Sequence, residues 1–510
     1  MNRAKIFTLV ALATFQMVAA KPLEVWIEPN GANPQGILEE RLADFRKETG
    51  LDAKVVVLDW GEAWSRISSA LESGNGPDVL QLGTTWVSHF ASEGYLAPLN
   101  SHSAAINPDR FMPTSWKTTQ VDGDSTFYAV PWFMDIRVLM ANRRWVEAQG
   151  IKASDVASID GFRRTLVKLR KANLVRDDAT PIYPFSFPGK SDWNIPHNFA
   201  PWIWSQGGDF IGKVNGKWRS MLLEKNTVIG IRRYIGFVLD SLTNPASLKE
   251  NTAQVTGRFN NGEQIFSINT SEVIMQTRLP ETEGGTQNSR IGQEGIRTFP
   301  IPAGPGGSVA FVGGSDLALP KVKAHDANAL KLLLFLTRPD NLDKYTKKIG
   351  FLPPDRGVLQ VWAQDSLYRV LVEQAENGRA YPNVPNWGDI ESVLVEMFSA
   401  TWTLLDSRGA YTDEELYKIL VQYNNKLNQM LNVTDSTAAV MTLPQFQEDI
   451  KSIKTLAELQ TEDSLAAVKA KAPASIIPSG NSSVVYGGIA AGILILIVAI
   501  VAIIRKKKTT

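Results

Sequence analysis

The sequence predicts an α/β protein with more than one lobe. Between residues 23 and 82, short runs rich in β-branched residues alternate with segments whose apolar residues recur at helical spacing. This alternation is typical of a parallel sheet covered by helices on both faces. The chain has 510 residues, which is more than a single hydrophobic core usually supports. Its composition, 44% hydrophobic and 21% charged, is ordinary for a packed protein.

The individual elements follow from periodicity and from glycine and proline. At the start of the chain we expect a strand at 23–27, a helix carrying Ile37, Leu38, Leu42 and Phe45, a strand at 53–58, a helix at 62–71 and a strand at 79–82. Glycine and proline interrupt the pattern at 131–135 and at 300–315, and an amphipathic helix is expected at 327–336. The last helix of this body should begin after Thr412 and end near Leu431.

Both ends of the chain carry membrane-related signals. Residues 483–504 form an uncharged apolar run that is long enough, as a helix, to cross a bilayer. The basic cluster within 505–510 favours the cytoplasmic side. Residues 1–20, with Arg3 and Lys5 before an apolar stretch, are typical of a cleavable export signal. We therefore expect an exported body, periplasmic or extracellular, that a single-pass C-terminal helix anchors in the cell (inner) membrane.

Residues 433–482 should connect the body to that helix. Up to about residue 472 the pattern is helical but polar, and residues 473–482 are small. One interpretation is a helical stalk and a flexible linker that hold the body away from the bilayer. The alternative is that the helices of this region pack on the body.

Composition excludes several kinds of chemistry. The chain has no cysteine, so disulfides, thiolate metal sites and cysteine nucleophiles are impossible. Its four histidines show no metal-binding spacing, and we expect no metal and no other cofactor. No nucleophile elbow or phosphate-binding loop is present, so we name no catalytic residue and do not expect an enzyme. A formal net charge of +1 gives no bias toward nucleic acid, which we do not expect as a partner.

Tryptophan is the informative residue type, with fourteen in the chain. Several lie beside glycine, proline, acidic or amide residues in expected loops. Sugars have an apolar face and a hydroxyl rim, so flat aromatic rings with polar neighbours suit them, and crevices in α/β sheets open at the carboxyl ends of the strands. For the loop residues, binding and packing remain open alternatives; they are Trp60, Trp86, Trp132 and Trp202.

Six segments, taken in order, resemble motifs of a known family. They are 76–79 with 90–99, 127–131 with 135–142, 259–264, 299–302 with Gly304, Gly313 and Gly314, 381–387, and the capped helix at Thr412. Over about residues 23–431 the chain thereby resembles the extracellular solute-binding proteins of sugar ABC importers, the maltose-binding-protein-like family.

The resemblance implies a two-lobed periplasmic-binding-protein fold, type II-like, with hinge crossovers and a ligand cleft. It implies a domain at 21–432, with one lobe at about 21–130 and 270–314 and the other at about 135–265 and 320–432. The cleft residues that it implies are Asn30, Thr85, Trp86, Asp135, His197, Asn198, Phe199, Trp202, Thr270, Gly313, Gly314, Ser315 and Trp387. For the glycines, a hinge requirement is an equal alternative to ligand binding.

The leading functional hypothesis joins these expectations. It is a membrane-tethered receptor that captures a sugar or oligosaccharide by closure of its lobes and delivers it to the permease subunits of an ABC transporter. A second hypothesis is a tethered sensor for a signalling partner. A third, ranked lowest because no acid/base pair emerges, is a polysaccharide-active enzyme.

Overall fold

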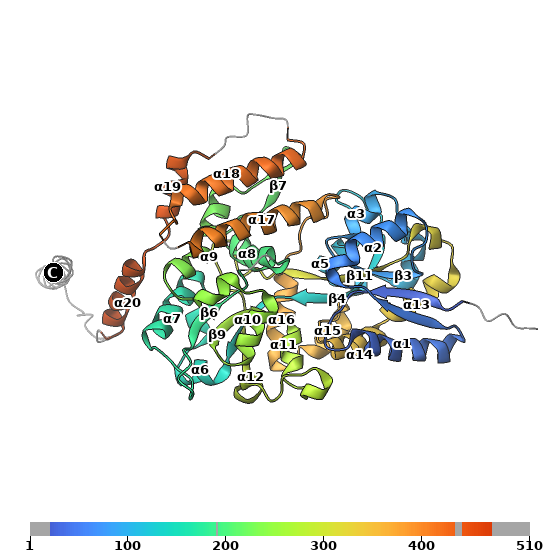
Figure 1. Cartoon of the computed structure of the whole chain (residues 1–510), viewed down its shortest axis with the longest axis horizontal. Coiled ribbons are helices and arrows are strands. Elements are labelled where there is room, and N and C mark those ends of the chain that lie inside the picture. Colours follow the sequence, from blue (N-terminus) through green and yellow to red (C-terminus); the bar gives the residue numbers. More distant parts are fainter. Residues whose placement is uncertain (1–20, 190–191, 408, 434–440, 472–510) are drawn as a thin grey trace, which may run out of the picture. The chain divides into compact units, whose positions relative to one another are not determined.

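The computed structural model describes residues 21–189, 192–407, 409–433 and 441–471. The chain divides into two units, one that ends at Lys454 and one that begins at Thr455. The first unit contains both main sheets (Figure 1). The second contributes one described helix, α20 (Leu456–Lys471), where the Glu458 carboxylate accepts a hydrogen bond of 2.7 Å from the Thr455 amide. This bond satisfies a free amide at the start of the helix.

The segments expected to be an export signal (1–20), a membrane-spanning helix (483–504) and a basic tail (505–510) lie outside the described residues. Among the residues that are described, no helix combines the length and the apolarity needed to cross a bilayer.

The first lobe is built on a five-stranded sheet in the order β2-β1-β3-β11-β4. Its strands are β1 (Leu23–Ile27), β2 (Ala53–Val57), β3 (Val79–Gly83), β4 (Ala129–Ile136) and β11 (Val312–Ala318). β1 pairs in parallel with β2 and β3, whereas β11 runs antiparallel between β3 and β4. The helices of this lobe are α1 (Pro34–Thr49), α2 (Trp60–Glu72), α3 (Val87–Ser92), α4 (Ser103–Ile106), α5 (Pro113–Lys117), α13 (Ala327–Thr337) and α14 (Pro339–Ile349).

Helix α1 shows why the start of the chain folds as its pattern predicts. The Asn33 side chain caps the helix by accepting a hydrogen bond of 3.1 Å from the Gly36 amide. Ile37, Leu38, Leu42 and Phe45 form its buried face, and Gly50 ends it with φ of 75°. The alternation of strands and helices expected over residues 23–82 is confirmed.

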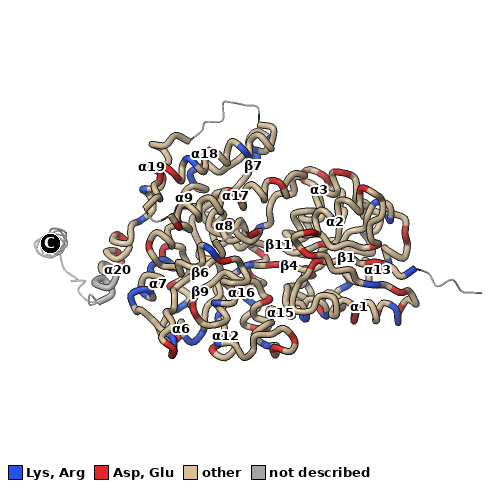
Figure 2. The backbone as a smooth tube through the Cα atoms, in the orientation of Figure 1, with Lys and Arg blue, Asp and Glu red and all other residues tan. Residues whose placement is uncertain are grey.

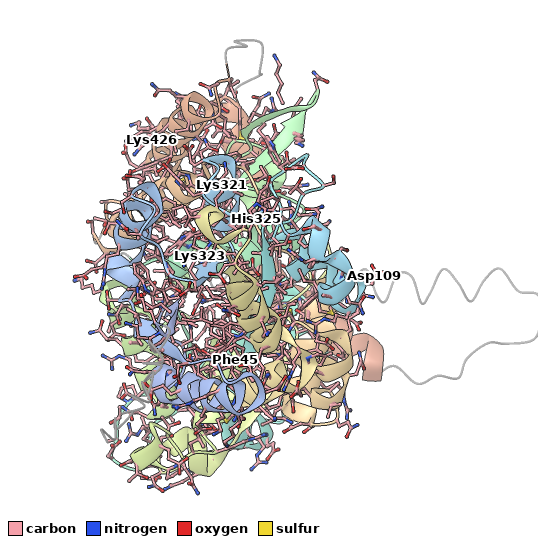
Figure 3. The ribbon with its side chains drawn as sticks, turned by 90° about the vertical axis from the view of Figure 1, so that its right-hand side faces the viewer. Phe45, Asp109, Lys321, Lys323, His325 and Lys426 are labelled. Carbon is pink, nitrogen blue, oxygen red and sulfur yellow. The ribbon has the colours of Figure 1, made fainter. Side chains whose placement is uncertain are left out.

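Figure 3 faces the first lobe and labels Phe45, whose ring packs against Phe335 of α13 at 5.2 Å. Lys321 and Lys323, also labelled, lie in the short turn between β11 and α13. The Lys323 ammonium pairs with the Asp78 carboxylate at 2.6 Å and ties this turn to the start of β3. Both signs of charge are interspersed over the first unit (Figure 2).

The second lobe contains a four-stranded sheet in the order β10-β5-β9-β6. Its strands are β5 (Val138–Asn142), β6 (Tyr183–Ser186), β9 (Gln264–Asn269) and β10 (Ile296–Phe299), and β7 (Ile211–Val214) and β8 (Lys217–Ser220) form a separate hairpin. The helices are α6 (Arg143–Ala148), α7 (Ile159–Lys171), α8 (Asn194–Ser205), α9 (Lys225–Leu239), α10 (Thr252–Asn260), α11 (Ser271–Gln276), α12 (Arg290–Glu294), α15 (Arg356–Trp362), α16 (Ser366–Asn377), α17 (Trp387–Asp406), α18 (Asp413–Met430) and α19 (Leu443–Lys451). Short 3₁₀ helices join elements of both lobes; they are η1 (Asn100–His102), η2 (Pro108–Arg110) and η6 (Lys321–Lys323) in the first lobe and η3 (Ala153–Val156), η4 (Pro245–Lys249) and η5 (Glu281–Glu283) in the second.

The division of the chain between the lobes differs from the expected boundaries. β10 lies in 270–314, which was assigned to the first lobe, yet it pairs with β5 of the second sheet. α13 and α14 lie in 320–432, which was assigned to the second lobe, yet Leu332, Leu333 and Tyr345 belong to the core that contains β1 and α1. The reason is topological. After β10 the chain returns to the first lobe at β11, and it leaves that lobe again only after α14.

The crossings between the lobes lie side by side. β4 and β5 belong to different sheets and are separated only by Arg137. The Met134 amide donates to the Leu352 carbonyl at 2.7 Å, and the Arg137 amide donates to the Phe311 carbonyl at 3.2 Å. β4, the segment before β11 and the segment after α14 are therefore hydrogen-bonded where the two lobes meet.

Helix α19 falls in the region expected as a stalk, but it packs on the second lobe against α9 and α18. Phe446 is fully buried, and its ring lies 5.5 Å from that of Tyr417. The Tyr417 hydroxyl donates to the Met441 carbonyl at 2.8 Å. Of the two alternatives for this region, packing on the body holds for α19, because Phe446 and Ile450 give it a buried apolar face.

Asp316 is a fully buried acid in β11. Burial raises its pKa from 3.8 to about 7. The Thr118 hydroxyl lies 2.6 Å from the Ser115 carbonyl and 2.9 Å from Asp316 Oδ2. A hydroxyl has one hydrogen and a carbonyl can only accept. A proton on Asp316 therefore lets both contacts be hydrogen bonds.

Asp316→Asn is expected to reduce the loss of stability that accompanies a rise in pH from 4 to 8. A folded-state pKa above the unfolded value means that the contribution of Asp316 is fully present below pH 3.8 and is lost as the pH rises through about 7. Asparagine does not titrate, so the variant should gain on the wild type by up to roughly 4 kcal/mol between pH 4 and 8. Urea unfolding at both pH values measures this difference in the free energy of unfolding. If the free energies of unfolding of the two proteins change in parallel with pH, Asp316 is ionised in the folded state and the prediction is wrong.

Candidate functional site

A cavity of about 840 Å³ lies between the two lobes. Its first-lobe wall comes from the ends of β1, β2 and β3 and from β11, and its second-lobe wall from α8, α10, α11 and the end of β9. Asp135, Arg137 and Phe311 of the crossings also line it. Both lobes and their connections therefore contribute side chains to one space. Its volume is in the range of small-molecule sites, about 300–1,000 Å³.

Indole rings form the first-lobe side of the cavity. Trp60 and Trp86 follow the carboxyl ends of β2 and β3, and their ring centroids are 5.5 Å apart in an edge-to-face arrangement. The Trp64 ring also packs edge-to-face against Trp86, with the ring centroids 5.3 Å apart. The Trp60 Nε1–H donates to the Pro29 carbonyl at 3.0 Å, while 38% of the residue stays exposed. Across the cavity, Trp193 of the second lobe is 53% exposed.

A charged pair lies where the crossings reach the cavity. The Arg137 guanidinium donates to Asp135 Oδ2 at 3.1 Å and to Asn194 Oδ1 at 2.5 Å. Arg137 is 5% exposed, whereas the Asp135 side chain is 19% exposed, so the carboxylate end of the pair reaches the cavity. Asp135 Oδ1 is buried and has no hydrogen-bond partner in the described protein. The pair thus leaves one carboxylate oxygen free to accept a bond from a bound molecule.

Buried titratable side chains support the second-lobe wall. The His197 ring stacks on Phe311 with centroids 4.3 Å apart, and its Nδ1 lies 2.8 Å from the Tyr381 hydroxyl. Burial, with a contribution from Arg137, holds the pKa of His197 well below 6.5. His197 Nε2 is 3.6 Å from a carboxyl oxygen of Glu391, whose pKa burial raises to about 8. The His197 ring and the Glu391 carboxyl group are therefore both neutral at pH 7, and together they form a polar but uncharged surface.

Glu272 of α11 is the remaining perturbed acid of the wall. Burial raises its pKa to about 7, and the negative charge of Asp135 adds to the rise. One carboxyl oxygen accepts a hydrogen bond of 3.0 Å from the side-chain Nε2 of Gln276. Asp135 and Glu272 are therefore two acids that repel each other within one cavity.

Comparison with known proteins assigns the chain to a family. A model described as "Bacterial extracellular solute-binding protein" matches residues 29–342, which is more than half of the 510 residues. The chain belongs to the family of bacterial extracellular solute-binding proteins. The resemblance inferred from the six sequence motifs is thereby confirmed.

Similar proteins extend this assignment. The chain is 26% identical to the diacetylchitobiose binding protein DasA of Streptomyces coelicolor over 376 residues, covering 73% of this chain and 83% of DasA. The structure resembles maltose-bound MalE3 of T. maritima with a TM-score of 0.66 at 20% identity, covering 80% of this chain and 99% of MalE3. It also resembles the GacH receptor of Streptomyces glaucescens, solved unliganded and with acarbose, with a TM-score of 0.66 at 20% identity, covering 81% and 99%. These likenesses show the two-lobed fold of such binding proteins.

Most of the residues expected in the cleft of this solute-binding protein line the cavity. They are Asn30, Trp60, Thr85, Trp86, Asp135, His197, Asn198, Thr270, Gly313, Gly314 and Ser315. They come from segments up to 285 residues apart in sequence, from Asn30 to Ser315. The fold therefore brings these positions together around one cavity.

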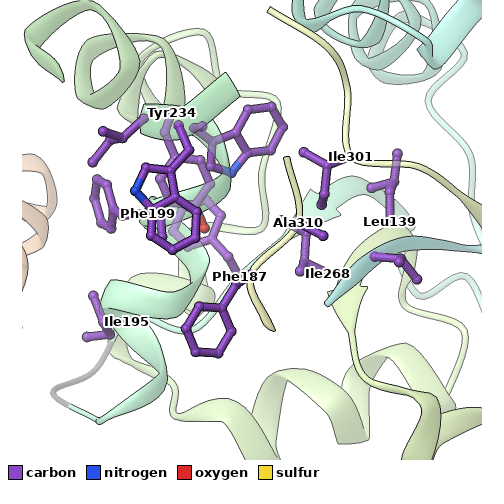
Figure 4. Packing of buried hydrophobic residues seen from close by; sticks show 14 of the residues in the cluster. Leu139, Phe187, Ile195, Phe199, Tyr234, Ile268, Ile301 and Ala310 are labelled. Atoms are coloured by element: carbon purple, nitrogen blue, oxygen red, sulfur yellow. The ribbon is translucent and has the colours of Figure 1, made fainter. Parts of the chain in front are cut away.

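Four expected residues instead lie in the packed interior and not in the cavity wall. Trp132 stacks on Tyr345 at 4.3 Å in the first-lobe core. In the second-lobe core, Phe199 stacks on Phe398 at 3.7 Å and Trp202 stacks on Tyr234 at 5.4 Å. Figure 4 shows Phe199 and Tyr234 in this cluster. Trp387 stacks on Tyr381 at 4.5 Å, and each of the four is at most 1% exposed. Their large apolar surfaces are used in packing, so they are corrected from binding to core residues.

Several cavity residues were not among the expected site residues. Trp193 had a sequence signal, since it lies between Asp192 and Asn194 in a loop pattern like those of the other candidates. Arg137 had no sequence signal, and only the structure places it between β4 and β5. Glu272 and Glu391 lie on helices with no local motif, and only the packing of α11 and α17 brings them to the cavity.

Proposed function

We propose that this protein captures a sugar or oligosaccharide between its lobes and delivers it to the permease of an ABC importer, without changing it chemically. The observation that carries the proposal is the cavity between the lobes, with indole faces on both sides and amide and carboxyl groups between them. Aromatic rings cover the apolar face of a sugar, and the polar groups bond its hydroxyl rim. The ligands named for similar proteins, diacetylchitobiose, maltose and acarbose, support the same class.

Lobe closure provides the signal that a permease reads. A ligand that touches both walls binds the closed state better than the open one, and this difference in affinity shifts the population toward closure. The narrow connections at Arg137 and near Leu352 are the segments that such a motion bends. We further propose that residues 483–504 anchor the protein in the membrane with the lobes outside the cytoplasm. Fractionation of cells that produce the full chain tests the anchor, because an anchored protein stays with the membranes after a high-salt wash.

Saccharide binding is expected to raise the melting temperature of the protein. A ligand at one hundred times its dissociation constant stabilises the folded state by about 2.7 kcal/mol. The full chain, purified in a mild detergent, is screened by thermal shift against diacetylchitobiose, maltose, cellobiose and their longer homologues, and positive results are titrated by calorimetry. A shift with at least one saccharide supports the proposal. Shifts only with polyamines or metal complexes would assign the cavity to another class of solute, and release of shorter sugars from any of these substrates would show an enzyme.

A further inference from the structure

The cavity contains more acidic than basic side chains. Among the described residues of its wall, the acids are Asp135, Asp192, Glu272 and Glu391, and the only arginine or lysine is Arg137. The Arg137 guanidinium is already shared between Asp135 and Asn194. His197 adds no positive charge, because burial keeps its ring neutral. A bound molecule therefore meets negative potential on the side of the second lobe.

Two of the four acids have other roles. Asp192 is fully engaged in local structure: its Oδ2 accepts from the Thr252 amide and hydroxyl, both at 2.8 Å, and its Oδ1 accepts from the Asn194 amide at 2.6 Å. Glu391 is 3% exposed and is held protonated at neutral pH by its burial. The charge that a ligand can reach is therefore that of Asp135 and Glu272.

Neither of these two carboxyl groups has its bonding capacity filled by the protein. Asp135 Oδ1 is buried without a partner in the described protein, and Glu272 accepts a hydrogen bond from the Gln276 side-chain amide at only one of its two oxygens among the described contacts. Each carboxylate raises the cost of ionising the other. A protonated amine between them removes that cost and supplies the missing donors, whereas a hydroxyl group supplies a donor without a charge.

Two buried asparagine side chains of the same wall each have a polar atom without a hydrogen-bond partner in the described protein. Asn198 is 2% exposed, and its Oδ1 has no partner, although its Nδ2 donates to the Asn194 carbonyl at 2.8 Å. Asn269 is 6% exposed and has an unpartnered Nδ2. Leaving such groups unpaired costs free energy, so both point to a polar ligand. One offers an acceptor and the other a donor, which suits an amine next to hydroxyl groups.

We infer, building on the proposed function, that the saccharide carries a free, protonated amine and that this amine binds between Asp135 and Glu272. The ligand class is an amino sugar or a short oligomer of amino sugars that is not acetylated on nitrogen. An acidic sugar is excluded by the same negative potential. A neutral sugar binds more weakly, because it brings no positive charge to the two acids.

Three disaccharides with one skeleton separate these cases. The β-1,4-linked dimer of glucosamine, its di-N-acetylated form and cellobiose differ only in the group at carbon 2 of each ring. Calorimetry of the full chain at about pH 6.5 is expected to give at least about tenfold tighter binding for the free amine than for cellobiose, which is about 1.4 kcal/mol. Because charge-assisted bonds carry this preference, added salt should reduce it.

Variants locate the preference at the two acids. Asp135→Asn and Glu272→Gln should each reduce the preference for the amine over cellobiose to threefold or less, while Asp340→Asn, which removes an exposed carboxylate outside the cavity, should leave it unchanged. Equal or tighter binding of the acetylated dimer or of cellobiose in the wild type overturns the inference but leaves the proposed function standing. Failure of all three dimers, and of the wider saccharide panel, contradicts the proposed function itself. Thermal melting of each variant verifies that it is folded.

Discussion

Replacing Trp86 with alanine is expected to weaken saccharide binding by about thirtyfold or more, which corresponds to about 2 kcal/mol. Trp86 lines the cavity, and contacts with Trp60 and Trp64 at 5.5 and 5.3 Å fix the orientation of its ring. A ring that is already held in place loses little entropy when a sugar stacks on it. The substitution removes this face and also loosens Trp60, so the loss should exceed that of an isolated aromatic contact.

Trp202→Phe is the matched control. Trp202 was expected in the cleft but lies in the second-lobe core, stacked between Phe162 and Tyr234. The control should therefore lower the melting temperature and leave the dissociation constant within about twofold. Trp86→Ala should instead raise the dissociation constant and change the melting temperature less than the control does. Trp86→Phe, which keeps a smaller ring, should fall between alanine and the wild type. Calorimetric titration of all three with the best saccharide of the panel measures this, and an unchanged affinity in Trp86→Ala removes the ring from the site.

Local pattern was enough to predict the fold class and the first elements. Residues 23–82 fold as expected because each strand and helix there is specified by its own periodicity and caps, as α1 shows with Asn33 and Gly50. The boundaries of the lobes could not be obtained in this way. α13 is apolar along much of its length, and nothing within it says which sheet it covers; that depends on the pairing of β11 with β3 and β4.

Loop composition was a weaker guide to the cleft than position after a strand. Trp60 and Trp86 follow the carboxyl ends of parallel strands, where cavities open, and both line the cavity. Trp132 has a proline neighbour like a loop residue, but it lies inside β4 and faces Tyr345. Glu391 could not be found from sequence at all, because its approach to His197 depends on tertiary packing of α17 against α8.

Gly314→Ala is expected to destabilise the protein by about 3 kcal/mol or more. Gly314 has φ of 131°, and a Cβ atom at this position would lie 2.1 Å from the Phe133 carbonyl oxygen and 2.9 Å from Met134 Cα. Alanine would therefore incur both backbone strain, of about 1–3 kcal/mol, and a steric clash with the backbone of β4 that no side-chain rotation relieves. Ligand binding and a hinge requirement were the alternatives for this glycine. The close approach of β11 to β4 is a separate reason and is sufficient to require it.

Gly307→Ala separates the clash from the strain. Gly307 also has a positive φ, 96°, but a Cβ there would meet no atom within 4 Å, so only the conformational cost of about 1–2 kcal/mol applies. Urea unfolding with an unchanged slope should place Gly314→Ala well below Gly307→Ala in stability. Because Gly314 also lines the cavity and pairs with Met134 beside the crossing, folded Gly314→Ala should bind saccharide poorly. Equal destabilisation by the two substitutions would mean that β11 and β4 can separate at this point, and the connection between the lobes would then be softer than the contact implies.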